Sequence, residues 1–558
     1  MKFPRWLRQC FPAILLLVIL SGRAADLINV DPGVIIVTNA ARQGIDENYL
    51  MDSERKRLVA PPRTTQAALQ EIAPRFMRYP GGEKSQSHFW SVPPWTNSQP
   101  TLCLTGPDYW PADDGEFTVD DNGAWIPGQE PLTFDEFMAN CQAVGAQANI
   151  ALCYSAAYDK LFSTNDARTT LQDEITNAVS WVRYANITKG YHVQYWTLGN
   201  ETDQNENGNP GAAQYAADLV AFSQAMKAVD PTIKFCANAS LTATLQTILQ
   251  EAATNVDCIE VHEYPVYNWS NQYNYFLDNP TTNLGLASAA AWAIQTIQTY
   301  APTSGIQVFL GETAAHDYGA NGSYWTNYND LGHAIVTFEI FGENLLVPQL
   351  QFAEFWNTRW ISDDIENSNT YDCFEALSSG NALNPTGRAL AIWGQFLQQR
   401  LVSATSTDLV RAYASYSPGA NLLTVFLENK DTNAHPTVVA LTNFPGVASA
   451  QTWSLYGQGP GDLNPTWAQL ADVPVSSNQV SLTLAPVSIS VLVLPGSPLY
   501  LNATLVGNNL ALTWSAPEAT LEQADSIGGP WTPVPGVSGS SATYAEVSPA
   551  SRFFRLRQ

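Results

Sequence analysis

The sequence is short of positive charge. Its 558 residues contain 26 Lys and Arg against 51 Asp and Glu, which gives a formal net charge of −25 at pH 7. So acidic a chain repels phosphate backbones, and no nucleic-acid partner is expected. Charged residues reach only 14%, whereas hydrophobic residues make up 45% and aromatic residues 11%. This composition excludes intrinsic disorder and coiled coil and favours a large buried core.

Long apolar runs are also scarce. The one that stands out, Ala13–Leu20, follows a basic start with Lys2, Arg5 and Arg8. A basic start and a short apolar stretch are typical of a secretory signal peptide, and the stretch is too short to cross a membrane as a helix. Residues 1–24 are therefore predicted to be removed on export. The mature protein would be secreted or periplasmic, with no membrane span.

Cysteine is rare, with seven in the chain and six after removal of the signal peptide. No CxxC or clustered Cys/His spacing occurs, so no metal site is predicted. No glycine-rich phosphate loop follows a predicted strand, and no cofactor is expected. Cys153, Cys236 and Cys258 lie inside strand-like runs, where buried thiols are expected. The sequence fixes neither the disulfide pairing nor the oligomeric state.

Strand-like and helical segments alternate along residues 25–400. Eight short β-rich runs are separated by longer amphipathic stretches such as Phe134–Val144 and Ala212–Val229. Eight strands alternating with helices predict a (β/α)8 TIM barrel. The predicted strands are Val34–Asn39, Arg75–Tyr79, Ala148–Cys153, Val193–Leu198, Thr232–Ala237, Val256–His262, Ile306–Leu310 and Leu350–Phe355.

The pattern changes after residue 400. Runs such as Leu422–Leu427 and Val480–Leu494 alternate apolar and polar residues with the period of half-buried strands. Residues 401–495 are therefore predicted to form an all-β sandwich. A Pro-Gly-Ser-Pro linker leads to a small C-terminal β-module at 499–558. The predicted fold class is α/β, a barrel followed by these two β regions.

Two glutamates follow predicted strands at comparable places. Glu201 ends the sequence Trp-Thr-Leu-Gly-Asn-Glu after the fourth strand, and Glu312 ends Val-Phe-Leu-Gly-Glu after the seventh. The C-terminal ends of barrel strands meet at one rim, so these residues would face each other across a cleft. Glycoside hydrolysis uses such a pair, in which one carboxylic acid protonates the leaving oxygen and one carboxylate attacks the anomeric carbon.

These motifs resemble those of the retaining glycosidases of clan A. Within that clan the likeness is greatest to the α-L-arabinofuranosidase branch. It is carried by Phe76–Gly82, which reads Phe-Met-Arg-Tyr-Pro-Gly-Gly, by Phe134–Phe137 and by Val261–Tyr264. The resemblance covers roughly residues 30–495. It implies a carbohydrate substrate and an enzyme that hydrolyses O-glycosidic bonds.

The resemblance also implies roles for individual residues. Glu201 would be the acid/base and Glu312 the nucleophile, with Asn200 binding the sugar 2-hydroxyl. Arg78 and Tyr264 would hold the carboxylate of Glu312, and Arg78 would keep it ionised. To act as an acid, Glu201 would need a raised pKa.

Further residues are candidates for binding the sugar. His262 lies at a strand end, as either a substrate contact or a buried, hydrogen-bonded histidine. Trp356 resembles the aromatic floor under the reactive sugar, although a core tryptophan is the alternative. Aromatic residues in the inserts after strands are candidate subsite walls because aromatic faces stack on sugar rings. They are Trp90, Trp95, Tyr109, Trp110, Trp125, Tyr267, Trp269 and Trp325.

Two departures keep the substrate open. Glu83 follows Pro-Gly-Gly where the arabinofuranosidase pattern has a cysteine, and it is either a substrate contact or a structural acid paired with Lys84. The carboxylate that the pattern places after the first strand is matched only loosely, by Asp46 or Glu47. In that family both features touch the sugar at the cleavage subsite.

The predicted function is a secreted retaining glycosidase that cleaves plant or algal polysaccharide or oligosaccharide by double displacement, with α-L-arabinofuranosidase favoured. Other clan A activities remain open, namely β-xylosidase, endo-glucanase or xylanase, agarase and β-glucuronidase. The negative charge of the chain disfavours a uronate substrate. A non-catalytic carbohydrate-binding protein is a third alternative, disfavoured because both glutamates and Arg78 are present.

Overall fold

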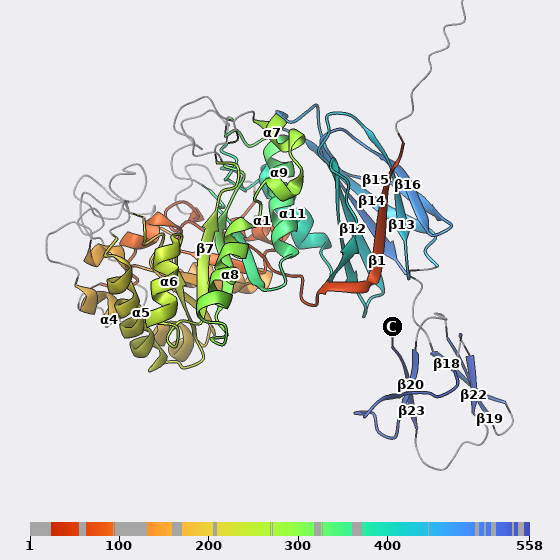
Figure 1. Ribbon diagram of the computed structural model, residues 1–558, viewed down its shortest axis with the longest axis horizontal. Coiled ribbons are helices and arrows are strands. Elements are labelled where there is room, and N and C mark those ends of the chain that lie inside the picture. Colours follow the sequence, from red (N-terminus) through yellow and green to blue (C-terminus); the bar gives the residue numbers. More distant parts are fainter. Residues whose placement is uncertain are drawn as a thin grey trace, which may run out of the picture.

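The computed structural model shows a barrel, a second all-β region and a small C-terminal β part (Figure 1). The structure describes residues 24–54, 63–92, 94, 131–158, 170–204, 209–267, 269, 272–316, 325, 327–359, 371–444, 446–496, 501–506, 509–514, 520–537, 539, 541–544 and 552–557. Within these ranges, no helix is both long enough and apolar enough to cross a membrane.

Eight parallel strands close into the predicted TIM barrel, each pairing with the next along the chain and the last with the first. Every predicted strand after the first has its counterpart in the structure. The barrel strands are β2 (Gln43–Asp46), β3 (Phe76–Tyr79), β4 (Gln147–Leu152), β5 (Tyr195–Leu198), β6 (Lys234–Asn238), β7 (Cys258–Glu263), β8 (Gln307–Thr313) and β9 (Leu350–Phe355).

The first barrel strand was predicted wrongly. The structure places Val34–Val37 in β1 (Asp26–Val37), which pairs with strands of the second region, and the barrel opens with β2. Buried and exposed residues mix along β1, whereas all four residues of β2 are buried. The short Gln-Gly-Ile-Asp of β2 has no hydrophobic run. Its Gly44 is needed because a Cβ there would lie 2.7 Å from the carbonyl oxygen of Phe76.

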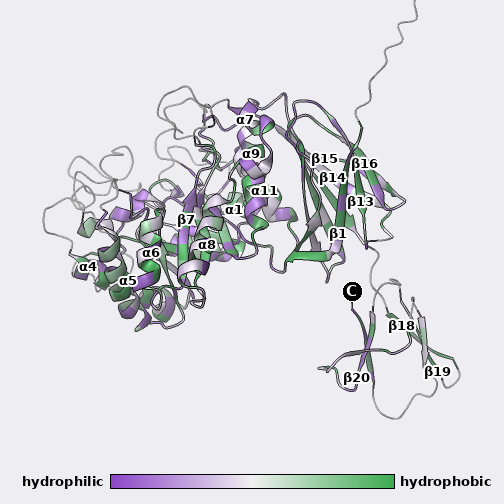
Figure 2. Cartoon of the chain, in the orientation of Figure 1, coloured by the Kyte–Doolittle hydropathy of each residue, from purple (hydrophilic) through white to green (hydrophobic). Residues whose placement is uncertain are grey.

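Helices surround the barrel and carry both hydrophobic and hydrophilic stretches (Figure 2). Capping boxes at Thr133 and Thr170 begin α3 and α4, because each threonine and the acid three residues later satisfy orphan backbone N–H groups. The helices are α1 (Thr65–Ile72), α3 (Phe134–Val144), α4 (Leu171–Val182), α5 (Ala212–Lys227), α6 (Thr242–Glu251), α7 (Tyr273–Asp278), α8 (Ser288–Tyr300), α9 (Leu331–Leu345) and α11 (Pro385–Phe396).

Aromatic rings fill part of the inside of the barrel. The ring of Phe352 stacks on Phe76 with centroids 4.0 Å apart and on Phe309 at 4.4 Å. Cys236 and Cys258 belong to this cluster as buried thiols, as predicted. Phe76, Cys236 and Cys258 lie at or near the starts of their strands, so this layer closes the N-terminal end of the barrel. The polar groups at the strand ends therefore rest on a packed floor.

The second region is a ring of nine strands that β1 completes, in the order β1-β10-β11-β12-β17-β14-β15-β16-β13. The all-β prediction for this region is confirmed, but residues before the barrel also contribute to it. Its other strands are β10 (Arg400–Ala404), β11 (Val410–Ser417), β12 (Leu422–Asn429), β13 (His435–Leu441), β14 (Ser449–Tyr456), β15 (Thr466–Ser476), β16 (Gln479–Leu484) and β17 (Ser488–Pro495).

The C-terminal part forms two three-stranded sheets around its own small core of Leu512, Trp514, Leu521 and Val534. One sheet has the order β18-β19-β22 and the other β21-β20-β23. The strands are β18 (Leu501–Val506), β19 (Asn509–Trp514), β20 (Thr520–Ala524), β21 (Thr532–Pro533), β22 (Ser541–Tyr544) and β23 (Phe553–Arg557).

Helix α9 lies between the barrel and the nine-stranded ring and packs against both (Figure 1). It is buried along almost its whole length. The Nζ of Lys430 lies 3.1 Å from Glu339 Oε2, and both side chains are fully buried. The ring of Tyr413 on β11 covers Gly342 so closely that a Cβ there would overlap it. The two regions are thus held by both a buried ion pair and close packing.

We expect Gly342→Ala to lower the free energy of unfolding by about 1–3 kcal/mol, because the added methyl group must displace the buried Tyr413 ring. Urea denaturation checks this. Gly419→Ala is the control, since no atom lies within 4 Å of the Cβ position there. Equal stability of the two variants would contradict the close packing of α9 on the β region.

Candidate active site

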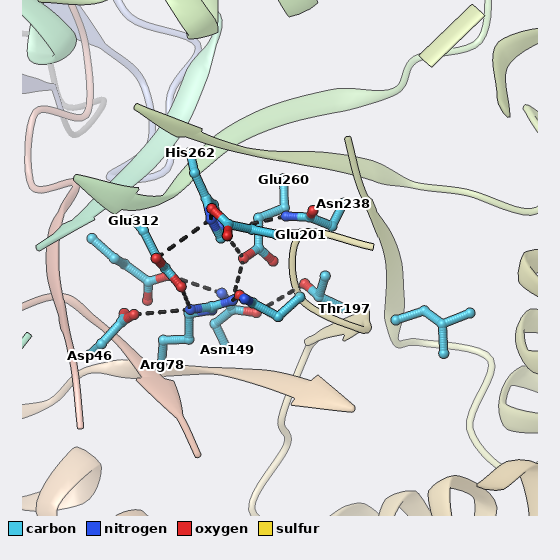
Figure 3. A network of polar contacts seen from close by, with 12 residues as sticks. Asp46, Arg78, Asn149, Thr197, Glu201, Asn238, Glu260, His262 and Glu312 are labelled. Atoms are coloured by element: carbon cyan, nitrogen blue, oxygen red, sulfur yellow. Dashed lines mark hydrogen bonds and ion pairs between the residues drawn. The ribbon is translucent and has the colours of Figure 1, made fainter. Parts of the chain in front are cut away.

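A buried arginine organises the C-terminal ends of the barrel strands (Figure 3). The side chain of Arg78, on β3, is fully buried. Its Nη1 donates to Glu312 Oε1 at 2.6 Å and to Asp46 Oδ2 at 3.0 Å. Its Nη2 donates to Asn200 Oδ1 at 2.7 Å and lies 2.9 Å from Glu260 Oε1. One guanidinium thus gathers side chains from β2, β7 and β8 and from the turn after β5.

The carboxylates fix the charge of this arginine. Burial alone would lower the pKa of Arg78, but the charges of Glu260, Asp46 and Glu312 outweigh it and raise that pKa well above its ordinary value. The pKa of Asp46 is also raised, because burial and the charge of Glu312 outweigh the attraction of Arg78. Arg78 is therefore held as a cation, while burial and the charge of Glu312 oppose the ionisation of Asp46.

The two predicted catalytic glutamates lie close together beside His262. One carboxylate oxygen of Glu201, one of Glu312 and a ring nitrogen of His262 all lie within 4.8 Å of one another. The Nδ1 of His262 is 3.0 Å from Glu201 Oε1 and 3.5 Å from Glu312 Oε2. Retaining glycosidases hold their two carboxyl groups about 5–5.5 Å apart, so this spacing suits double displacement.

The imidazole of His262 carries a positive charge. Burial lowers its pKa, but the charge of Glu312 and the hydrogen bonds to Glu201 and Glu260 raise it to about 10. The Nε2 of His262 lies 3.0 Å from Glu260 Oε1, so both ring nitrogens face carboxylates. His262 is thus hydrogen-bonded through both ring nitrogens, as one of the two sequence alternatives expects, and it lies beside both predicted catalytic glutamates.

The pKa of Glu201 moves opposite to the direction expected. Burial raises it, but the hydrogen bond and charge of His262, with the charge of Arg78, outweigh burial and lower it. In the free protein the proton is therefore on His262 Nδ1 rather than on Glu201. The sequence analysis expected a raised pKa for Glu201 and missed the imidazolium beside it.

Both oxygens of Glu312 are occupied. Arg78 binds Oε1, and the hydroxyl of Tyr264 donates to Oε2 at 2.8 Å. The backbone of Gly82 lies against the same carboxylate, since a Cβ there would be 2.5 Å from Glu312 Oε1 and 2.8 Å from the ring of Trp356. Trp356, 4% exposed, thus lies beside Glu312 with its ring packed against Gly82.

The turn that carries Glu201 is held by an amide that sequence reasoning missed. Gly199 and Glu201 have positive φ values of 74° and 46°, which place the glutamate on a tight turn after β5. Gln86 Nε2 donates to the carbonyl oxygen of Asn200 at 2.5 Å, and its Oε1 accepts from the N–H of Ser155 at 3.1 Å. Gln86 therefore ties the loops after β3, β4 and β5 together.

Glu260 is the second residue that the sequence analysis overlooked. It stands two positions before His262 on β7, and residues two apart on a strand point to the same face. That alternation could have revealed it. Gly311 makes room for it, because a Cβ at that position would overlap the carboxylate of Glu260.

Among the described residues, three of the four proposed aromatic subsite walls are buried instead. Trp90 is fully buried, and Trp269 and Trp325 are 4% and 7% exposed. Trp325 stacks on His333 of α9 with ring centroids 3.7 Å apart, so its ring packs against a helix. Tyr267, 52% exposed, keeps an accessible ring. Trp95, Tyr109, Trp110 and Trp125 lie outside the described residues.

The remaining sequence candidates differ in position. Glu83 is half-buried and begins the 3-10 helix η2 (Glu83–Ser87) directly after Gly82, next to the site. Asp46 faces Arg78, whereas Glu47 accepts a hydrogen bond from Asn140 on α3, 2.8 Å away. Both Asp46 and Glu47 are fully buried.

The cluster of Glu201, His262 and Glu312 has the spacing of possible metal ligands. A histidine binds a metal through an unprotonated ring nitrogen. With a pKa of about 10, His262 carries protons on both nitrogens at neutral pH. In the structure these three groups form a hydrogen-bonded ion cluster.

We expect the stability of the protein to fall as the pH rises from about 6.5 to 10. The folded protein holds the His262 proton up to a pKa of about 10, against an ordinary histidine pKa of about 6.5, so the stabilisation is complete below the lower value and lost through the higher one. Urea denaturation across this range measures it. His262→Gln should flatten the decline, and an equal decline in the variant would contradict a charged His262.

One family of known proteins matches the sequence. Residues 68–281 match the family model of the alpha-L-arabinofuranosidase 1 domain. This range holds Arg78, Asn200, Glu201, His262 and Tyr264. No curated protein matches the chain at a significant level.

Solved structures share the fold at low sequence identity. The GH51 α-L-arabinofuranosidase of Thermotoga petrophila is 18% identical with a TM-score of 0.62, over 84% of this chain and 99% of the other. A bifunctional glucanase-xylanase from a metagenome library is 17% identical with a TM-score of 0.58, over 85% and 99%. A family 44 xyloglucanase of Paenibacillus polymyxa with xyloglucan is 14% identical with a TM-score of 0.56, over 84% and 99%.

The family match and the barrel agree with the resemblance carried by the motifs around Arg78, Glu201 and Tyr264. Over residues 68–281 the chain is therefore similar to the alpha-L-arabinofuranosidase 1 domain, and it shares its fold with glycoside hydrolases such as the GH51 α-L-arabinofuranosidase of Thermotoga petrophila.

Proposed function

We propose that the protein is an exported, retaining α-L-arabinofuranosidase that acts on plant or algal polysaccharides or oligosaccharides. The observation that carries the retaining mechanism is the approach of Glu201 and Glu312, whose nearest carboxylate oxygens lie within 4.8 Å. That spacing is close to the roughly 5–5.5 Å of retaining enzymes and shorter than the roughly 6.5–9.5 Å by which inverting enzymes leave room for the attacking water.

In the first step Glu312 attacks the anomeric carbon. A bond forms between its carboxylate oxygen and that carbon, and the bond from the carbon to the leaving oxygen breaks. Arg78 and Tyr264 hold Glu312 from both sides, which fixes the direction of attack. Fixing a reacting group in advance lowers the entropy cost of reaching the transition state.

The leaving oxygen takes its proton from Glu201. The proton stored on His262 Nδ1, 3.0 Å from Glu201 Oε1, passes to Glu201 and then to the leaving group. In the second step Glu201 accepts a proton from the water that attacks the glycosyl-enzyme bond, and Glu312 leaves as a carboxylate. Return of the proton to His262 restores the starting state.

Asn200 is the proposed contact of the sugar 2-hydroxyl. Its Oδ1 accepts from Arg78, so the groups it can offer a sugar are its N–H donors. A hydrogen bond to this hydroxyl strengthens as charge develops at the anomeric carbon. Trp356, packed against Gly82 beside Glu312, is the proposed apolar surface under the same sugar ring.

Export is supported by the basic and apolar pattern of residues 1–24. The first strand, β1, begins at Asp26. Cleavage after residue 24 would therefore leave β1 whole.

A second candidate is an endo-acting glucanase or xylanase. Asp46 and Glu47 are both fully buried and bound to Arg78 and Asn140, so neither is presented to a sugar as the arabinofuranosidase pattern expects. Glu83 also departs from that pattern. The exposed ring of Tyr267 would suit a longer chain of sugars.

Replacement of the two glutamates tests the mechanism. We expect Glu312→Ala to abolish turnover of 4-nitrophenyl α-L-arabinofuranoside, and Glu201→Ala to lower kcat/KM by about 10²–10⁴-fold. NMR of the first-formed sugar should show retained anomeric configuration. Glu174→Gln is the control, because Glu174 is a buried acid on α4. Full activity of Glu312→Ala, or an inverted product, would overturn the proposal.

A substrate panel distinguishes the two candidates. We expect release of arabinose from the nitrophenyl glycoside and from arabinan, measured by chromatography of the products. Xylan, β-glucan, xyloglucan and agar serve as the comparison. Cleavage restricted to these polymers, with oligosaccharide products, would replace the arabinofuranosidase assignment by the endo-acting one.

A further inference from the structure

Glu260 lies between the two cations of the site. Its Oε1 is 2.9 Å from Arg78 Nη2 and 3.0 Å from His262 Nε2, and its side chain is fully buried (Figure 3). Each cation uses its other side to reach a catalytic glutamate. Arg78 donates to Glu312 through Nη1, and His262 faces Glu201 through Nδ1.

The backbone is shaped to bring these groups together. The pairing of β7 with β8 slips between Val261 and His262, so His262 lies opposite Glu312 rather than Gly311. Such bulges re-aim side chains next to active sites. The missing side chain of Gly311 leaves the space that the Glu260 carboxylate fills. The bulge in β7 and the glycine at position 311 thus both help to place the Glu260 carboxylate beside His262.

Glu260 is a charged anchor in spite of its burial. Burial raises its pKa, but the charge of Arg78 and the hydrogen bond and charge of His262 outweigh this and lower it. The other groups that face the His262 ring are Glu201, Glu312 and the amide of Asn238, whose Nδ2 is 3.4 Å from Nε2. The ring therefore meets three carboxylates, of which Glu260 is the one outside the reaction.

We propose that Glu260 is a positioning residue that keeps the transferable proton on His262 Nδ1 and aims it at Glu201. By accepting from His262 Nε2 and Arg78 Nη2 on one oxygen, it fixes the direction of the remaining N–H groups of both cations. Through Arg78 and His262, Glu260 thereby also fixes the positions of the Glu312 and Glu201 carboxylates. This inference rests on the proposed roles of Glu201 and Glu312.

Glu260→Gln tests the proposal because the amide keeps the shape and removes the charge. We expect the midpoint of His262 protonation to fall by about one pH unit or more, since one of its three counter-charges is lost. The high-pH limb of kcat/KM for 4-nitrophenyl α-L-arabinofuranoside should move down with it. Glu260→Asp, which keeps the charge, should return both towards the wild-type values.

The midpoint is measured by NMR of ¹⁵N-labelled imidazole rings, with His262 assigned by the loss of its signals in His262→Gln. The chain has six histidines, which keeps the spectrum simple. This readout needs no substrate. Glu174→Gln is the matched control for loss of a buried carboxyl group and should leave the His262 midpoint unchanged.

An unchanged midpoint in a folded Glu260→Gln protein would overturn the proposal, even if its melting temperature falls. If that variant does not fold, the titration of the His262 imidazole in the wild-type protein tests the proposal. An imidazole that titrates near the ordinary value of about 6.5 would overturn the proposal, and one that stays protonated well above neutral pH would support it. Activity that survives Glu312→Ala would instead refute the proposed function, so the two failures are distinguishable.

Discussion

The burial of one positive charge shapes the whole catalytic end of the barrel. A guanidinium out of contact with water is tolerated only when carboxylates and hydrogen-bond acceptors surround it. Arg78 obtains these from Asp46, Asn200, Glu260 and Glu312, which lie on four separate segments of the chain. The requirement to neutralise Arg78 therefore brings the acidic side chains together before any substrate arrives.

The sequence was enough to predict most of this arrangement. A barrel places the ends of its strands at one rim, so the positions of Arg78, Glu201, Tyr264 and Glu312 near strand ends implied their proximity. The protonation pattern could not be predicted in the same way. It depends on distances of about 3 Å between His262 and its neighbours, which strand position alone does not give.

Other errors came from reading local pattern without its tertiary partner. The run at Val34–Asn39 has strand character and does lie largely in a strand, but its hydrogen bonds go to β10 and β13 rather than to the barrel. The tryptophans at 269 and 325 were assigned to subsite walls because they follow strands, yet they stack on each other, and Trp325 also stacks on His333 of α9. Whether a side chain is buried depends on the surface that packs against it, and the sequence of a single segment does not reveal that surface.

The position of β1 has a consequence for the order of folding. Val30 pairs with Ala404 and with Leu441, so the first strand of the chain finds its neighbours only after the whole barrel has been synthesised. Contacts so distant in sequence close slowly because the chain entropy of a long loop must be lost first. The nine-stranded ring cannot close from the N-terminus onwards. Along the chain, the barrel lies between β1 and the other strands of the ring. We therefore expect β1 to pair last, although it is synthesised before the barrel.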